Sequence, residues 1–294
     1  MTRCFSPPYY DCDAQFSDLG RQWKRYFRKK TGHPASSRVD TLVTVLEKLK
    51  SATDSVLGDL GPFDKAFITV PNFPAFFLED LVDAGEYLGV QLLTLPWYIH
   101  RSGDQAQWPV SELNTAFAGN GLGIGHHDSQ NRSNPQPKEV LSVLYTNSTL
   151  STHVLSLFSA LGYSYSKGYT DFHLGFKFAP PYDKNCTSDY WHGVRRQLFV
   201  TLTSYYRYNY PDFLLDCVVS YGEAAHDPRF DRVIREEVLA FQRRDGEPKM
   251  LPVFSSVEPI FAAARGAALF GRYCTKLERP GDCIPDLRPR LPGW

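Results

Sequence analysis

The most restrictive feature of this sequence is a pair of short apolar runs on either side of a helical pattern. The first run, residues 66–71, is rich in aromatic and β-branched side chains and stops at a proline. Apolar residues then recur on one helical face over residues 78–88, and a second run covers residues 90–95 before another proline. Strand, helix and strand within about 30 residues match the length of a βαβ unit. The sequence therefore predicts an α/β sheet.

Charge and length narrow the class of protein. The 294 residues carry 32 Lys and Arg against 32 Asp and Glu, so the formal net charge is zero. This balance, without a block of like charges, predicts neither a nucleic-acid partner nor a membrane partner. No apolar stretch approaches the roughly 20 residues that span a bilayer, and the first residues do not resemble a secretory leader. We expect a cytoplasmic protein whose partner is a small molecule or another protein.

Changes in composition divide the chain into four segments. Residues 1–65 are predicted to form a helical N-terminal segment, and a first lobe covers 66–139, ending in a stretch rich in Gly, Ser and Asn. A strand hairpin opens a second lobe over 140–272. The proline-rich segment 273–294 is predicted to be an extended tail.

Residues 23–30 combine aromatic and basic side chains. Trp23, Tyr26 and Phe27 are spaced three and four positions apart, which places them on one face of a short helix. A basic stripe with aromatic residues can also hold nucleic acid. The spacing favours a helix that docks onto the rest of the protein through its aromatic face.

Two regions of the chain carry motifs of a known superfamily. Residues 67–71 read Phe-Ile-Thr-Val-Pro and precede a helix that contains Asp-Ala-Gly at 83–85, while residues 218–225 are followed by a small-residue helix over 260–270. These stretches resemble the first-lobe strand, the adenosine motif and the closing helix of the actin and seventy-kilodalton heat-shock protein superfamily. More closely, the chain resembles a divergent filamentous-fungal group of heat-shock-like or actin-like proteins. Residues 118–123 and the Ala-Ala-Arg-Gly-Ala-Ala stretch at 263–268 carry that likeness.

The resemblance implies a two-lobed actin-like or heat-shock-like ATPase fold, truncated at the N-terminus. Each lobe would be built on a ribonuclease-H-like sheet, with ATP and a metal ion between the lobes. The sequence departs from the family where phosphate is bound. No Asp-x-Gly-Thr hairpin precedes Phe67, and residues 144–149 read Leu-Tyr-Thr-Asn-Ser-Thr where an aspartate and glycines should stand. Glycine allows backbone N–H groups to approach an anion, so we expect degenerate phosphate loops.

These departures shape the expected chemistry. Tyr145 and Asn147 would crowd a phosphate, and no aspartate is left there to orient hydrated magnesium. We expect no metal site and no ATP hydrolysis. ATP or ADP could still bind at the adenosine-like stretch. The resemblance assigns that role to Gly222, Glu223 and Ala224, with Arg195 or Arg196 stacked on the base. The alternative is that Gly222 simply makes a turn and the two arginines are surface charges.

A second group of candidates consists of titratable side chains. His126, His127 and Asp128 form the densest cluster, on a glycine-rich loop, and are candidates for acid–base or ligand duty. Tyr145 and His173 are candidates to line the same cleft. The alternative for the cluster at 126–128 is a solvated loop without a function, and the alternative for the others is an ordinary strand position.

The leading hypothesis is a pseudoenzyme, a heat-shock/actin-like protein that acts as a cytosolic binding or accessory module. A first alternative is a fungal secondary-metabolism enzyme of the isomerase or cyclase type that uses the vacated cleft. The 17 Tyr, 20 Phe and 5 Trp motivate it, since aromatic walls suit small organic substrates. A second alternative is a nucleotide sensor that binds without hydrolysis.

Overall fold

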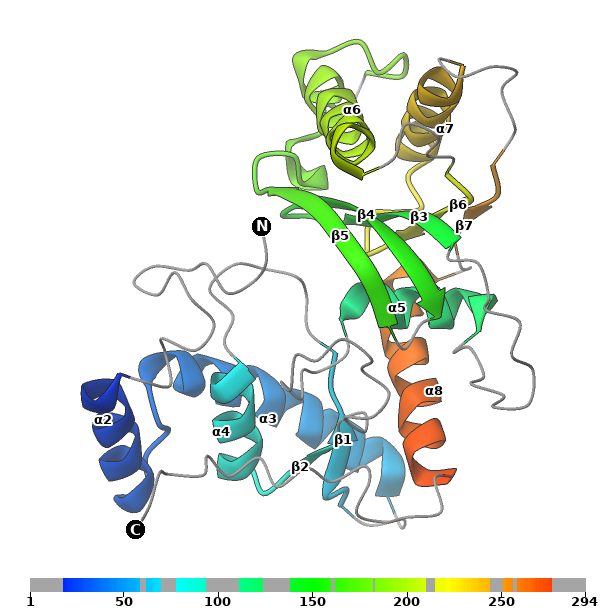
Figure 1. Ribbon diagram of the computed structural model, residues 1–294. Coiled ribbons are helices and arrows are strands. Elements are labelled where there is room, and N and C mark those ends of the chain that lie inside the picture. Colours follow the sequence, from blue (N-terminus) through cyan, green and yellow to red (C-terminus); the bar gives the residue numbers. More distant parts are fainter. Residues whose placement is uncertain are drawn as a thin grey trace. The chain divides into compact units, whose positions relative to one another are not determined.

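The structure is a computed structural model that describes residues 18–58, 62–69, 78–93, 111–123, 138–159, 162–181, 183–209, 215–243, 251–255 and 258–276. The chain divides into two compact units (Figure 1). The first comprises Met1–Val110 and Phe270–Trp294, and the second comprises Ser111–Leu269. The expected boundary lay after residue 139. The structure instead assigns residues 111–139 to the second unit, where Gly119 and Gly266 let helices pack with backbone against backbone.

The first unit contains the expected βαβ arrangement. Its elements are helices α2 (Leu19–Lys30), α3 (Ser37–Leu57) and α4 (Leu78–Tyr87) and strands β1 (Lys65–Phe67) and β2 (Gln91–Leu93). Strands β1 and β2 pair in parallel, with Ala66 opposite Leu92, and α4 lies between them in the chain. This confirms the strand–helix–strand prediction.

Helix α3 begins and ends where local chemistry directs it. The Ser36 side chain accepts a hydrogen bond from the Val39 amide at 3.2 Å, and Gly58 ends the helix with a φ of 51°. The buried residues Val39 and Val43 of α3 pack with Ala84 of α4. Phe67 of β1 stacks on Phe270, with ring centroids 5.6 Å apart.

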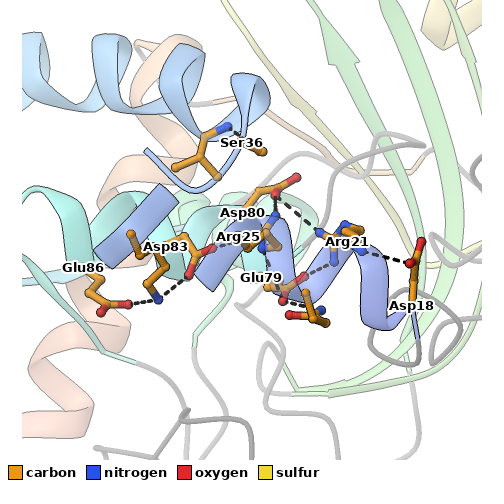
Figure 2. A network of polar contacts seen from close by, with 11 residues as sticks. Asp18, Arg21, Arg25, Ser36, Glu79, Asp80, Asp83 and Glu86 are labelled. Atoms are coloured by element: carbon orange, nitrogen blue, oxygen red, sulfur yellow. Dashed lines mark hydrogen bonds and ion pairs between the residues drawn. The ribbon is translucent and has the colours of Figure 1, made fainter. Parts of the chain in front are cut away.

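Helix α2 packs on α4 through charges rather than through its aromatic face (Figure 2). Arg25 is only 4% exposed and donates to Asp80 at 2.6 Å and to Asp83. Arg21 pairs with Glu79, and Lys29 pairs with Asp83 and Glu86. The docking prediction for Trp23, Tyr26 and Phe27 is therefore wrong: these side chains are 57%, 48% and 59% exposed, because the carboxylates of α4 take the opposite face.

The second unit is built on a five-stranded mixed sheet. Its elements are α5 (Glu112–Phe117), the π-helical turn η3 (Ala118–Leu122), β3 (Lys138–Tyr145), β4 (Leu150–Ser159), β5 (Gly162–Asp171), the 3-10 turn η4 (Phe176–Phe178), α6 (Asp189–Asn209), β6 (Cys217–Tyr221), α7 (Pro228–Gln242), β7 (Val253–Phe254), the 3-10 turn η5 (Pro259–Phe261) and α8 (Ala262–Lys276). The strand order is β5-β4-β3-β6-β7. Strand β4 is antiparallel to β3 and β5, whereas β6 is parallel to β3 and to β7. The α/β class is thereby confirmed.

Helices cover both faces of this sheet (Figure 1), with α6 and α7 on one face and α5 with the start of α8 on the other. The side of α6 and α7 holds a core that includes Leu141, Val154, Trp191 and Phe230. Helix α7 begins where the Asp227 side chain accepts from the amides of Arg229 and Phe230, with proline in its first turn. Because β3 and β6 pair in parallel, with Leu144 opposite Tyr221, the carboxyl end of β6 lies beside the turn that follows β3.

Candidate functional site

The turn between β3 and β4, residues 146–149, is the place where the resemblance expects phosphate. The turn closes on itself through Thr146. Its amide donates to the Thr149 carbonyl at 3.0 Å, and its hydroxyl accepts from the amides of Ser148 and Thr149 at 3.2 and 3.0 Å. A threonine hydroxyl that binds nearby backbone in this way stabilises a tight turn without glycine.

The remaining amide of this turn is bound by a carboxylate from the segment that follows β6. The Asn147 amide donates to Oε1 of Glu223 at 2.6 Å. Glu223 comes two residues after the end of β6, and β6 lies beside β3 in the sheet. All four amides of the turn are thus engaged inside the protein. A phosphate-binding hairpin works through amides that are free to donate to the anion.

The carbonyl side of the turn is covered by a segment that we call the strap, residues 175–177. The Phe176 amide donates to the Thr146 carbonyl at 2.9 Å, and the Lys177 amide donates to the Asn147 carbonyl at 3.0 Å. A Cβ at Gly175 would overlap the backbone of Asn147, so glycine allows this close contact. The strap therefore lies directly against the turn.

Gly222 joins β6 to the same turn. Its φ of 104° is a conformation that favours glycine, and a Cβ there would overlap the carbonyl oxygen of Tyr145. The Ala224 amide donates to that carbonyl at 3.1 Å, while the Gly222 amide donates to Pro259 at 3.2 Å. The structure thus brings Gly222, Glu223 and Ala224 together at the turn. The close backbone approach that Gly222 permits is occupied by Tyr145.

Tyr145 differs from its expected position. Its side chain points into the core, where its ring stacks on Phe230 at 3.9 Å between centroids and its hydroxyl lies 2.7 Å from that of Tyr190. Burial and the hydrogen bond to Tyr190 raise the pKa of Tyr145 far above its usual range. Tyr145 is fully buried. It therefore neither crowds the anion side of the turn nor lines an open cleft, because alternation along β3 directs it toward α6 and α7.

Tyr190 is a residue of this arrangement that the sequence analysis did not single out. Its hydroxyl donates toward the carbonyls of Leu174 and Gly175, at 2.9 and 3.1 Å. Burial raises the pKa of Tyr190 to about 12, and the hydrogen bond to Tyr145 offsets part of that effect. Tyr145 and Tyr190, which we call the tyrosine pair, therefore link the strap to the core by hydrogen bonds. Sequence spacing carries no signal for such a pair, since its members lie 45 residues apart.

The two candidate arginines lie elsewhere on the second unit. Arg195 of α6 pairs with Glu236 at 2.6 Å and Glu237 at 3.1 Å, both on α7. These carboxylates raise the pKa of the Arg195 guanidinium against the opposing effect of burial. Arg196 is exposed on the same helix. Arg195 thus fastens α6 to α7, and its bonds run to α7 rather than to the turn.

The titratable candidates are not assembled into one site by the described residues. His126, His127 and Asp128 lie outside them. His173 is exposed in the turn after β5, where its amide donates to Asp171 at 2.7 Å. Within the ranges that the structure describes, no three His, Cys, Asp or Glu side chains gather as metal ligands would.

Two further observations concern the chain as a whole. Among the helices in the described ranges, none is long and apolar enough to cross a membrane. The sequence matches no protein-family model and no curated protein.

Proposed function

We propose that this chain is a heat-shock/actin-like protein that has given up phosphate handling and acts as a binding or accessory module. The turn at 146–149 carries this proposal. Each of its four amides already has a partner within the protein, and one partner is the carboxylate of Glu223. A carboxylate there takes the place that an anionic ligand would need.

The topology of the second unit supports the resemblance. Three antiparallel strands, β3 to β5, are continued by β6 and β7, which are parallel to β3 and follow the crossover helices α6 and α7. This strand order is compatible with a ribonuclease-H-like sheet, which is the support it lends to the proposal. In the proposed assignment, the glycine turn after β6 corresponds to the adenosine motif and the small-residue helix α8 corresponds to the closing helix.

The residues around the turn do not fit a nucleotide phosphate. A phosphate brought to Asn147 would have to displace Glu223, and like charges at that distance repel. The strap closes the carbonyl side of the same turn, and the tyrosine pair holds the strap. The proposed activity is therefore the binding of a small molecule or another protein, without a hydrolytic step.

The test is the thermal unfolding midpoint of the full chain with and without Mg·ATP at millimolar concentration. A ligand present at a hundredfold excess over its Kd stabilises a native protein by about 2.7 kcal/mol, which raises the midpoint by several degrees. We expect no rise and no release of inorganic phosphate.

A matched pair of variants makes this test specific. Glu223→Ala removes the carboxylate from the turn, whereas Asp231→Ala removes an exposed carboxylate of α7 that pairs with Arg235 on its own helix. We expect that ATP stabilises neither the natural chain nor Asp231→Ala, and a rise confined to Glu223→Ala would support the view that this carboxylate excludes the anion. If ATP stabilises the natural chain, the protein is a nucleotide sensor and the proposal fails.

A further inference from the structure

The outward face of α2 is an unusual surface among the described residues of the first unit. Leu19, Trp23, Tyr26 and Phe27 are all exposed on this twelve-residue helix, and we call them the aromatic face. The three rings contact one another, with Trp23 stacked on Phe27 at 5.7 Å between centroids and Tyr26 edge-on to both. Aromatic residues normally carry the burial of a surface helix. Here they are displayed.

The orientation of α2 is fixed by its opposite face. Turning the aromatic face inward would withdraw Arg25 from Asp80 and Asp83, whose side chains are 5% and 8% exposed. Leaving buried carboxylates without a partner costs several kcal/mol. The ion pairs with α4, drawn in Figure 2, therefore hold the rings toward solvent.

The charged residues of α2 itself are all basic. Helix α2 contains no acidic residue, and its sequence ends in Arg28, Lys29 and Lys30. Lys24, Arg28 and Lys30 are exposed, and the Lys30 ammonium lies 5.6 Å from the centre of the Tyr26 ring. The acids of α4 pair with Arg21, Arg25 and Lys29, on the opposite face of the helix. The cationic character beside the aromatic face therefore comes from Lys24, Arg28 and Lys30.

We propose that the aromatic face of α2 and its flanking cations bind the surface of an anionic lipid bilayer. Trp and Tyr favour the headgroup region of a bilayer, and nearby Lys and Arg are attracted to acidic lipids. The rings pack against one another, so they offer a continuous surface rather than a slot for the side chain of a protein partner. A bilayer accepts such a surface without a complementary shape.

The experiment is cosedimentation of the full chain with vesicles of phosphatidylcholine alone and with vesicles that contain about one third phosphatidylserine. We expect binding to the anionic vesicles, at least about tenfold weaker binding to the neutral ones, and a further loss as salt shortens the Debye length from about 10 Å to about 3 Å. Equal binding to both vesicle types, or to neither, overturns the proposal.

Variants locate the effect on α2. Phe27→Ala should weaken binding to anionic vesicles about tenfold, whereas Phe178→Ala, at a similarly exposed ring of the second unit, should not. Lys24→Glu should weaken binding, and Lys184→Glu serves as its control on another exposed lysine. Equal losses in test and control variants contradict the assignment to α2. A dimer in solution that Phe27→Ala dissociates, without vesicle binding, would show that the face joins two copies and would also overturn the proposal.

Discussion

Replacing Arg25 with methionine keeps the length of the side chain and deletes the charge that α4 surrounds. The Arg25 guanidinium lies 2.6 Å from Asp80, contacts Asp83 and is 3.4 Å from Glu79. Burial opposes the charge, yet the hydrogen bond to Asp80 and the carboxylates of Asp83 and Glu79 raise the pKa of Arg25 overall. The guanidinium is therefore charged whenever the protein is folded.

The cost of this replacement follows from what it leaves behind. Removing one partner of a buried ion pair typically costs about 3–5 kcal/mol, because the other charge stays buried. Lys29 still contacts Asp83 at 3.0 Å, and Arg21 still lies 3.7 Å from Asp80. These two cations compensate in part, so we expect a loss of about 3 kcal/mol in the free energy of unfolding.

Urea unfolding followed by circular dichroism measures this loss. With a slope of about 2 kcal/mol per molar urea, Arg25→Met should lower the midpoint of the transition that includes the first unit by about 1.5 M. Arg235→Met is the control, because its pair with Asp231 is roughly half exposed and should contribute less than about 0.5 kcal/mol. Equal midpoints for the two variants would refute the view that the ion pairs of Arg25 hold α2 on α4.

Two further outcomes are expected of the second unit. Gly222→Ala should lower the free energy of unfolding by well over the roughly 1–2 kcal/mol that a positive φ alone costs, because a Cβ would also overlap the Tyr145 carbonyl. Gly58→Ala is the control, because Gly58 has a φ of 51° with open space around it and its replacement should show the cost of the positive φ alone. Equal losses in the urea midpoints of the two variants would contradict the overlap. The tyrosine pair should make the stability of the protein fall at alkaline pH, because the pKa of Tyr145 and of Tyr190 is raised in the folded state. The contribution of the pair to the free energy of unfolding is complete below about pH 10, the pKa of an unfolded tyrosine. It is lost as the pH rises toward the folded pKa, which is about 12 for Tyr190. Unfolding free energies measured at pH 8 and pH 11 should therefore differ, and the double variant Tyr145→Phe with Tyr190→Phe should reduce that difference, whereas an unchanged difference would contradict the role of the pair.

Much of the secondary structure could be predicted because its causes are local. Helix α7 begins at the N-cap Asp227 and Pro228, and helix α3 lies between the N-cap Ser36 and the C-cap Gly58. The apolar runs at 66–71 and 90–95 predicted paired strands, which β1 and β2 confirm over the residues described. Each of these signals lies within a few residues of the element that it predicts.

The candidate site could be predicted only in part. The place of Gly222 at a strand-to-helix turn followed from its neighbours in sequence. Its contact with Tyr145, the carboxylate of Glu223 on Asn147 and the strap over the turn all join residues about 30 to 77 positions apart, with Glu223 to Asn147 separated by 76. No local pattern encodes such partners.

Helix α2 shows the same division most clearly. The sequence alone indicated a short helix over residues 23–30, with Trp23, Tyr26 and Phe27 on one face and with cations but no acids. The tertiary structure decided which face is buried. A hydrophobic face is favoured in the core by its area, but four carboxylates on α4 bind the basic face more specifically, and burying Arg25 without them would be prohibitive. The sequence of a helix specifies which residues share each face, but it does not specify the surface on which the helix will pack.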